Sequence, residues 1–393
     1  MMRDFSLDWP SPLDPPALLS ELDAEKPVFR VRMPSGDTGY LVTRYDDVVR
    51  VLSDPVFSRA WMFRPGAPRY SDRPIGLPDS LLNLDPPEHG RLRRAVSRAF
   101  TPRRVEAMRA GVEEVAEDLL DRMEAAGGPA DLVEAFCAPL PVSVICRLFG
   151  VPEADRPALR KWIETALSLT AHSAEESFDA LMRLHGYFTD LGAARRAEPG
   201  DDLLSTLITA PDRRDELTDA ELVGVAGTII GAGFETTVHQ LAISAYVLLR
   251  DPERYAGLRR EPGGVPAAVE ELLRMTPAVH GTARIATEDV EVGGERVPAG
   301  SMVLAWTAAA NRDPGAFSGA TALDLGRSRN DHLTFGHGPH FCLGAGLARV
   351  ELRAGLAALL RRFPDLRLAA DPAELRWRSG MVAFGPHELP VRW

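Results

Sequence analysis

A single cysteine near the carboxyl end of the chain carries the clearest chemical signal in the sequence. Cys342 lies in a glycine-lined loop, after Phe335 and His340 and directly before an apolar segment typical of a helix. The glycines let the backbone adopt positive φ and pass close beneath a large flat group. The partially positive N-terminus of the helix favours a thiolate over a thiol. One presented thiolate, with no second cysteine nearby, suits haem iron better than zinc or an iron–sulfur cluster.

An acid and an alcohol stand side by side in the middle of another apolar segment. Glu235 and Thr236 belong to a stretch that begins at a capping box, with Thr218 as the N-cap and Glu221 three positions later. The predicted helix runs to about Leu249, spans ~45 Å and is buried, because it is apolar nearly all round. Adjacent carboxyl and hydroxyl groups suit general acid catalysis in a dry pocket. Close packing through the glycines of this helix is the alternative explanation.

Two further pairs of polar residues have helical spacing. His89 and Arg93 are four residues apart after two prolines that mark a helix start, so both lie on one face. Two such groups suit a pair of carboxylates, and a solvated basic face is the alternative. Glu271 and Arg274 are three residues apart. On spacing alone they predict a surface ion pair worth a few tenths of a kcal/mol.

Composition excludes several classes of protein. The chain has 393 residues, 45% of them hydrophobic and 26% charged, as in ordinary globular proteins. Its formal net charge of −11 argues against a general nucleic-acid binder. No apolar run approaches the ~18 residues that span a bilayer, so we expect no membrane anchor. Cys137 and Cys146 lie in apolar surroundings and indicate no disulfide framework, which favours a cytoplasmic location.

Helices dominate the predicted architecture, which is mainly α with a minor β region. The expected parts are a β-rich part at about 28–43 and 285–305 and a helical part at about 86–275 and 343–363. Residues 58–84 form a long irregular stretch rich in proline and glycine, typical of a functional loop. No linker divides the chain, so we expect residues 1–393 to form a single domain.

Taken in their order along the chain, these motifs resemble those of the cytochromes P450, the haem-thiolate monooxygenases, over essentially the whole chain. The segment 335–349 is similar to the haem-binding signature of that family at every fixed position. The resemblance implies the cytochrome P450 fold, with haem b between the long distal helix and the helix after the cysteine loop. Cys342 is then the axial ligand of the iron, and Phe335 packs beside the sulfur. The other implied haem-binding residues are His89, Arg93, Arg284 and His340 at the propionates, and Ala232, Gly233 and Gly344.

Residues 232–237 resemble the oxygen-binding segment of the family. By that resemblance Thr236 holds dioxygen, and Glu235 is its acidic neighbour in a proton relay. The implied reaction inserts one oxygen atom into a hydrophobic small molecule, by hydroxylation or epoxidation, in natural-product biosynthesis. The intact acid–alcohol pair favours this reaction over two alternatives. These are a peroxide-driven peroxygenase or oxidative coupling enzyme, and a non-catalytic haem-binding module recruited by a carrier protein.

The Glu271–Arg274 pair resembles the buried structural pair of the family. A further basic residue normally completes that network, and this chain has Ala322 in its place. The buried pair must then find other partners among backbone carbonyls, water, Arg327 or Arg329. We expect this departure to weaken haem retention.

The chain has no evident means of taking electrons from a nicotinamide. Residues 344–349 lack the last glycine of a dinucleotide fingerprint, and no iron–sulfur spacing occurs. Electrons are therefore expected from a ferredoxin and a ferredoxin reductase, with the enzyme a monomer. A basic cluster is the expected docking site of an acidic ferredoxin, and a solvated helix face is the alternative. Its members are Arg91, Arg93, Arg94, Arg98, Arg103 and Arg104.

The resemblance also outlines a substrate pocket. Its expected walls are residues 58–84, 167–190, 277–282 and 380–382, with Ile229, Ala232 and Gly233 of the long helix. Most of these residues are apolar, which predicts a hydrophobic substrate. Five side chains are candidates for recognising a polar or aromatic group of the substrate, or else are ordinary loop residues. They are Trp61, Phe63, Arg64, Arg69 and His280.

Overall fold

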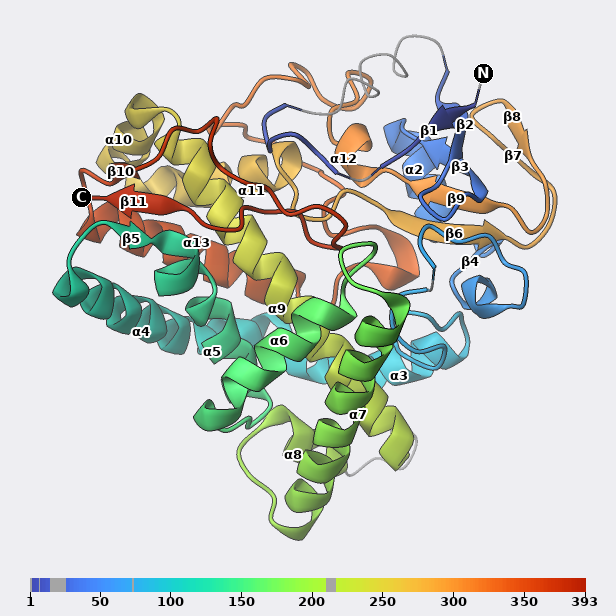
Figure 1. Cartoon of the computed structure of the whole chain (residues 1–393), viewed down its shortest axis with the longest axis horizontal. Coiled ribbons are helices and arrows are strands. Elements are labelled where there is room, and N and C mark those ends of the chain that lie inside the picture. The colour runs from blue at the N-terminus through green and yellow to red at the C-terminus, as the bar shows by residue number, and fades with distance from the viewer. Residues whose placement is uncertain (1, 7, 15–25, 73, 210–216) are drawn as a thin grey trace.

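The long apolar helix predicted from the sequence crosses the whole molecule. The computed structural model describes residues 2–6, 8–14, 26–72, 74–209 and 217–393. Helix α9 (Asp219–Leu249) runs diagonally through it (Figure 1). Thr218 and Glu221 form the expected capping box, in which each side chain accepts a hydrogen bond from the backbone N–H of the other. Most residues of α9 are buried, as its apolar pattern predicts.

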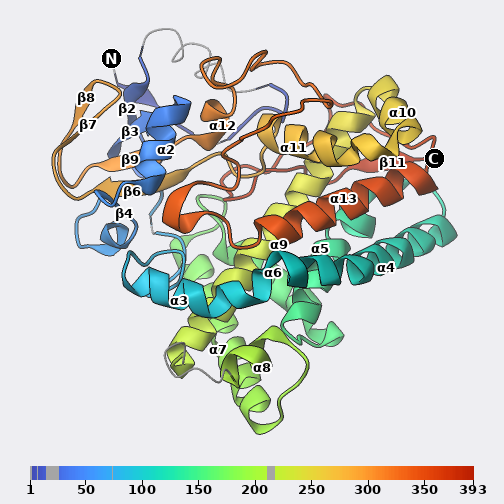
Figure 2. The ribbon, with the colours of Figure 1, turned by 180° about the vertical axis from the view of Figure 1, so that it is seen from behind.

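Helices surround α9 and make up about half of the chain. The α-helices described beside it are α2 (Tyr45–Ser53), α3 (Glu88–Ser97), α4 (Pro102–Ala126), α5 (Pro139–Leu148), α6 (Arg156–Ala166), α7 (Ala174–Ala197), α8 (Leu203–Ile208), α10 (Pro252–Arg260), α11 (Val265–Met275), α12 (Thr307–Ala310) and α13 (Ala345–Arg362). Short helical turns include η1 (Ala60–Phe63), η3 (Val133–Cys137) and η7 (Gly338–His340). Helices α4 and α13 lie side by side, and α3 precedes α4 (Figure 2).

The largest part of the β-structure lies at one side of the helices, close to the N-terminus (Figure 1). Its main sheet has the strand order β1-β2-β3-β9-β6-β4. These strands are β1 (Arg3–Asp4), β2 (Val28–Arg32), β3 (Thr38–Val42), β9 (Met302–Ala305), β6 (Thr282–Ala286) and β4 (Phe57–Ser58). The antiparallel hairpin of β2 and β3 and the parallel pairing of β3 with β9 join the two predicted β-rich segments.

Two smaller sheets complete the strands. Strands β7 (Val290–Val292) and β8 (Glu295–Val297) form the second hairpin, around a pair of glycines. The other sheet contains β10 (Arg367–Leu368), β11 (Pro390–Arg392) and β5 (Ala130–Asp131), and the sequence did not predict it. The pairing of β11 with β5 joins residues that are far apart in the chain, which local patterns do not reveal.

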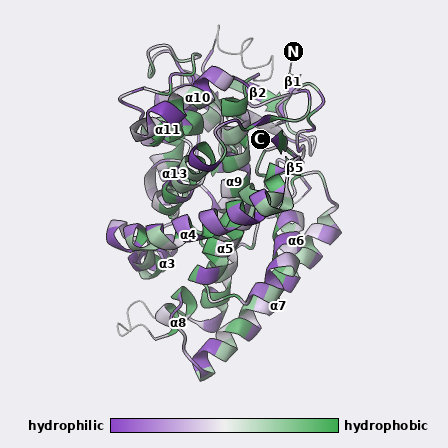
Figure 3. Ribbon diagram, turned by 90° about the vertical axis from the view of Figure 1, so that its left-hand side faces the viewer, coloured by the Kyte–Doolittle hydropathy of each residue, from purple (hydrophilic) through white to green (hydrophobic). Residues whose placement is uncertain are grey.

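Apolar residues face the interior of the helical part. Helix α4 buries Val112, Ala116, Leu119 and Met123, which recur at helical spacing, and its other face is hydrophilic. Figure 3 shows both colours on α4 and on α7, as expected for helices with one buried side. Within the described ranges, no helix is both long and apolar enough to cross a membrane.

Glycine sets the shape of the cysteine loop before α13. Gly336 and Gly338 have φ of +73° and +69°, a backbone conformation that glycine adopts without strain. A β-carbon at Gly338 would also lie 2.7 Å from the Leu52 carbonyl oxygen, so this position has no room for a side chain. Helix α13 begins at Ala345, three residues after Cys342, as the sequence predicted.

Candidate active site

One cavity brings together residues that lie far apart in the sequence. It has a volume of about 330 Å³, and both α9 and the cysteine loop contribute to its wall. The wall contains Thr236 and every residue expected to contact haem. Those residues are His89, Arg93, Ala232, Gly233, Arg284, Phe335, His340, Cys342 and Gly344. Glu235 is not part of the wall, although it is the neighbour of Thr236 in the chain.

Cys342 presents its sulfur to this cavity from the loop between η7 and α13. The side chain is exposed to the cavity, and the Cys342 N–H donates to the Phe335 carbonyl over 2.8 Å. Desolvation by the surrounding walls raises the pKa of the Cys342 thiol, although the Gly344 N–H and the Arg93 guanidinium act in the opposite direction. The start of α13 thus favours the thiolate, as the sequence predicts, but desolvation outweighs this effect. A metal ion bound to the sulfur would produce the thiolate.

Imidazole and guanidinium groups cluster in the wall of the cavity. The rings of His89 and His340 lie 4.1 Å apart between their centroids. Burial, followed by the nearby Arg284, lowers the pKa of His340 to about 2. Burial and Arg93 lower the pKa of His89 to about 4. Both imidazoles are therefore neutral at neutral pH, beside arginines that remain charged.

This cluster carries more positive charge than the protein neutralises. Burial and then the neighbouring Arg59 lower the pKa of Arg284 to about 9. Asp85 is close, but it already accepts a hydrogen bond of 2.8 Å from the Arg59 N–H. The buried His89 Nε2 has no partner in the described part of the chain. Two carboxylates here would satisfy the imidazole and offset the arginines, so the residues fit a haem ligated by Cys342 with its propionates in this cluster.

Arg59 and Glu351 also line the cavity, although sequence analysis did not single them out. The buried Arg59 guanidinium donates to the Asn83 side chain over 2.7 Å and to the Ala283 carbonyl over 3.2 Å. It thereby ties the irregular loop to strand β6. Burial raises the pKa of Glu351 well above its ordinary value, which favours the neutral acid. Neither residue belongs to a local motif, so only the tertiary structure reveals them.

Thr236 and Glu235 point to different surroundings. The Thr236 hydroxyl lines the cavity and donates to the Ala232 carbonyl over 2.7 Å, the type of bond by which a threonine competes with the helical backbone. The buried Glu235 carboxylate instead accepts a hydrogen bond of 2.6 Å from Arg378, and it lies 3.2 Å from the His239 ring nitrogen Nε2. Burial alone would raise the pKa of Glu235, but His239 and Arg378 outweigh it and lower the pKa to about 2. Glu235 is therefore ionised.

Arg378 is the centre of this second network, and the sequence did not identify it. It also donates to the Glu164 carboxylate of α6 over 2.7 Å and contacts the His239 ring. The guanidinium is buried, whereas Glu164 is partly exposed. The network therefore connects the acid of α9 with α6 and with the surface. No local pattern around Arg378 signals this role, because its partners are 139 to 214 positions away.

Known proteins decide the family of the chain. Residues 193–374 match the family model for cytochrome P450. Nocardicin C N-oxygenase from Nocardia uniformis subsp. tsuyamanensis is 49% identical to the chain, over 100% of the chain and 98% of that protein. Mycinamicin IV hydroxylase/epoxidase from Micromonospora griseorubida is 47% identical over 95% of the chain and 94% of that protein. The chain belongs to the cytochrome P450 family.

The fold agrees with that of a solved P450. The LnmA cytochrome P450 hydroxylase from the leinamycin biosynthetic pathway of Streptomyces atroolivaceus S-140 has a TM-score of 0.91 with this structure, at 46% identity and 100% coverage of both chains. Because P450 enzymes are haem-thiolate proteins, this P450 is a monooxygenase that uses haem b. The predicted fold class, enzyme class and cofactor are thereby confirmed.

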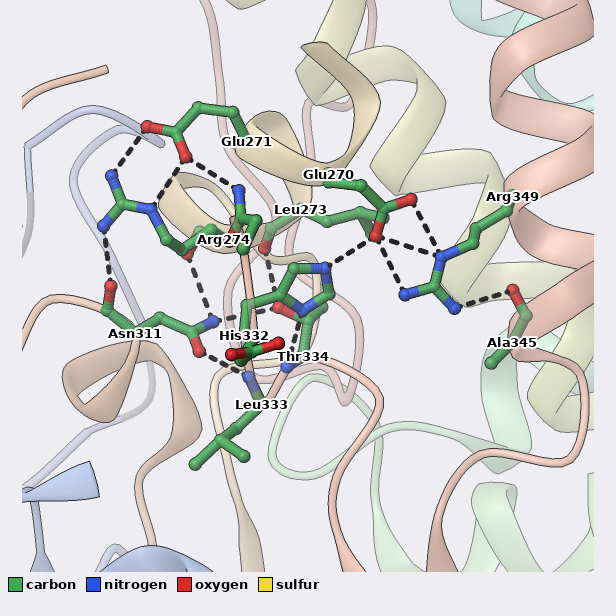
Figure 4. Close-up of polar contacts among 12 residues, drawn as sticks. Glu270, Glu271, Leu273, Arg274, Asn311, His332, Leu333, Thr334, Ala345 and Arg349 are labelled. Carbon is green, nitrogen blue, oxygen red and sulfur yellow. Dashed lines mark hydrogen bonds and ion pairs between the residues drawn. The ribbon is translucent and has the colours of Figure 1, made fainter. Parts of the chain in front are cut away.

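The structure brings Glu271 and Arg274 of this P450 together in its interior. Both side chains are fully buried, and they form two hydrogen bonds of 2.7 and 2.8 Å (Figure 4). The remaining Arg274 N–H groups donate to the carbonyls of Asn311, Ala320 and Ala322, so all five are used. A buried charge pair with complete hydrogen bonding avoids the penalty of an unsatisfied one.

Arg327 takes the place of the basic residue that Ala322 cannot supply. Its Nε lies 3.0 Å from Glu271 Oε2, and Asn330 donates to the same oxygen over 2.9 Å. Arg329 instead pairs with Asp331. The pair therefore does not lack partners, and the physical reason for expecting weak haem retention is removed.

Parts of the expected substrate pocket lie outside the cavity. Residues of α9, of 277–282 and of the irregular loop line it, but 167–190 and 380–382 do not. Those two segments bind each other instead, because three successive N–H groups, at residues 169 to 171, donate to the Gly380 carbonyl over 2.7, 2.9 and 3.2 Å. Their polar backbone groups are thus satisfied away from the cavity.

The five side chains considered for substrate recognition also lie outside the cavity wall. The Arg64 guanidinium stacks on the Trp61 ring at 3.4 Å. Arg69 donates to the Asp72 carbonyl over 3.0 Å. His280 stacks on the Trp9 ring with a centroid distance of 4.3 Å. Trp61, Arg64, Arg69 and His280 therefore have partners within the protein. Phe63 is the last residue of the short helix η1.

Proposed function

We propose that this P450 inserts one oxygen atom from dioxygen into a hydrophobic natural-product molecule, by hydroxylation or epoxidation. The observation that carries the proposal is the single cavity lined by both Cys342 and Thr236. Leu81, Ile229 and Val279 contribute apolar wall to the same cavity, which suits a hydrophobic substrate. The two relatives named for nocardicin C and mycinamicin IV support a substrate from natural-product biosynthesis.

Haem would supply the oxidising chemistry, and the chain supplies its surroundings. Cys342 would ligate the iron, with the Phe335 carbonyl holding the cysteine backbone N–H. His89, Arg93, Arg284 and His340 would bind the propionates. Ala232 and Gly233 on α9 leave room beside Thr236, because neither has a bulky side chain.

Proton delivery is proposed for Thr236 and Glu235. The Thr236 hydroxyl donates its own proton to the Ala232 carbonyl, so its oxygen is left to accept a hydrogen bond at the cavity wall. Glu235 is ionised, so it would pass protons on rather than store one. Its carboxylate must leave Arg378 to reach Thr236, and the partly exposed Glu164 gives the network a route toward solvent.

The test is turnover with a ferredoxin, a ferredoxin reductase and isotope-labelled dioxygen. Substrates are chosen from hydrophobic natural-product scaffolds that shift the absorption spectrum of the bound haem. The proposal predicts a product with one labelled oxygen atom. Equal product from hydrogen peroxide alone, with no loss in Thr236→Ala, would indicate a peroxygenase. Spectral shifts without any product would indicate a binding module.

We further propose that an acidic ferredoxin docks near helix α3. Arg91 is paired with Glu221, and Arg93 bonds the Phe341 carbonyl, so these two are engaged within the protein. The exposed members of the basic cluster are Arg94, Arg98, Arg103 and Arg104. A cytoplasmic location fits this partner, because Cys137 and Cys146 are buried free thiols.

Charge reversal tests the docking site. The double variant Arg94→Glu, Arg98→Glu should be reduced more slowly by the ferredoxin than the unaltered enzyme is. Added salt should make the two reduction rates more similar. Arg122→Glu is the matched control, because Arg122 is exposed near the far end of α4. Equal rates for the double variant and the control would refute docking at this surface.

A further inference from the structure

Helix α11 carries two adjacent acids that serve different networks. Glu271 faces Arg274 and Arg327, as described above. Glu270 turns instead toward α13 and toward the segment that leads into the cysteine loop (Figure 4). No motif in the sequence singled out Glu270, and the roles assigned so far leave it without one.

Three basic side chains converge on the Glu270 carboxylate. Arg349 approaches it in a bidentate manner, with Nε 2.8 Å from Oε1 and Nη2 2.8 Å from Oε2. Arg353 Nη2 lies 3.0 Å from Oε1, and His332 Nε2 lies 3.2 Å from Oε2. Burial alone would raise the pKa of Glu270, but His332 and Arg349 outweigh it and lower the pKa to about 2. The group is therefore a carboxylate at neutral pH.

Arg349 connects this carboxylate to both ends of the cysteine loop. Its guanidinium carbon lies 4.4 Å from the centre of the Phe335 ring, and its Nη1 lies 3.4 Å from the Ala345 carbonyl oxygen. Phe335 in turn accepts the Cys342 N–H at its carbonyl. The charge of Arg349 is close enough to lower the pKa of the Cys342 thiol, against the larger effect of desolvation.

The same segment is held to α11 and to Asn311 at the end of α12 by neutral hydrogen bonds. The Thr334 hydroxyl donates to the Leu273 carbonyl over 2.7 Å, and the Leu333 N–H donates to the Asn311 side chain over 2.7 Å. These bonds fix the backbone before Phe335 without Glu270. Glu270 adds a contact with His332 to this attachment, and its particular contribution is the position and the compensation of the charge of Arg349.

We infer that Glu270 is a positioning residue: it holds Arg349 against Phe335 and offsets its charge, and so sets the electrostatic field at the haem-ligating Cys342. The inference rests on ligation of haem by Cys342. Loss of the negative charge leaves the guanidinium uncompensated against Phe335, at the edge of the cysteine loop. A positive charge at that place favours the reduced haem, which carries one more electron.

The test is the reduction potential of the holoenzyme, measured by potentiometric titration without substrate turnover. Glu270→Gln should raise the equilibrium constant for one-electron reduction by about tenfold, which corresponds to about 59 mV. Arg349→Gln should shift the potential in the opposite direction, since it leaves Glu270 with one fewer cation. Glu270→Asp keeps the charge and should stay close to the unaltered enzyme.

Glu117→Gln is the matched control, because Glu117 pairs with Arg361 and Arg362 at the other end of α13. It should leave the potential unchanged. If Glu270→Gln does not retain haem, the inference is tested by Arg349→Gln alone, which should lower the reduction potential. Unchanged potentials in the variants that retain haem, or shifts of the same sign for Glu270→Gln and Arg349→Gln, would overturn the inference. A weaker absorption band of the thiolate-ligated carbon monoxide complex, with no change in reduction potential, would show that Glu270 has a structural role instead.

Discussion

Replacing Arg378 by glutamine is the sharpest test of the network around Glu235. Glu235 and Arg378 are both almost fully buried, and their ion pair measures 2.6 Å. The pKa of Glu235 falls from 4.5 to about 2 in the folded protein, although burial alone would raise it. That difference corresponds to roughly 3 kcal/mol of stability, to which His239 and then Arg378 contribute. Breaking a buried pair by removing one partner is strongly destabilising in other proteins as well, by about 3–5 kcal/mol.

Urea unfolding at neutral pH, followed by circular dichroism, measures the loss. We expect Arg378→Gln to lower the free energy of unfolding by about 3 kcal/mol. Arg160→Gln is the matched control: it removes an arginine that binds Glu134 with two hydrogen bonds, but both side chains are much more exposed. It should cost at most about 1 kcal/mol. Equal losses in the two variants would refute the argument from burial.

The difference in free energy of unfolding between the unaltered enzyme and Arg378→Gln should depend on pH in one direction only. Because folding lowers the pKa of Glu235, its contribution to stability is complete above pH 4.5 and is lost as the pH falls toward 2. The gap between the unaltered enzyme and Arg378→Gln should therefore be constant near neutral pH and should narrow in acid. A gap that widens as the pH falls below 4.5 would contradict the assignment of an ionised Glu235.

Three further predictions concern the site and its supports. Thr236→Ala should consume electrons but form hydrogen peroxide in place of product, as measured by the ratio of peroxide to product. Thr228→Ala, which alters a threonine two turns earlier in the same cavity wall, should keep more of its coupling. Arg327→Ala should speed the loss of haem to an acceptor protein, because Glu271 then loses a partner, whereas Ala322→Arg should bring no gain. Faster haem loss in the unaltered enzyme than in Ala322→Arg would contradict the structure.

Local sequence signals predicted much of this P450. The capping box at Thr218, the apolar pattern of α9 and the glycines beside Cys342 each act over a few residues, and each was predicted with the correct element. The spacing of His89 and Arg93 also placed both residues in the same cavity wall. Such features follow from helix geometry and from glycine's backbone freedom, which neighbouring residues determine.

Contacts between distant segments could not be predicted in this way. Arg59 bonds the Ala283 carbonyl 224 positions away, and Arg378 bonds Glu235 across 143 positions. The chain around each arginine has no periodicity that indicates a buried partner. The error over residues 167–190 has the same origin, since these residues bind the turn at Gly380 only in the folded chain.

The charge of Cys342 illustrates how tertiary surroundings oppose a local effect. The start of α13 directs N–H groups of Gly344 and Ala345 toward the sulfur and lowers its pKa, as the sequence suggested. Desolvation in the cavity is larger and raises the pKa overall. The sequence shows the helix start, but it does not show how strongly the walls exclude water.

The most direct test of the account is the absorption spectrum of the reduced, carbon monoxide-bound enzyme. The unaltered protein should show the red-shifted band of thiolate-ligated haem. Cys342→Ala should lose it, whereas Cys146→Ala, which alters a buried cysteine outside the cavity wall, should keep it. A thiolate band that persists in Cys342→Ala would contradict the assignment of Cys342 as the ligand of the haem iron.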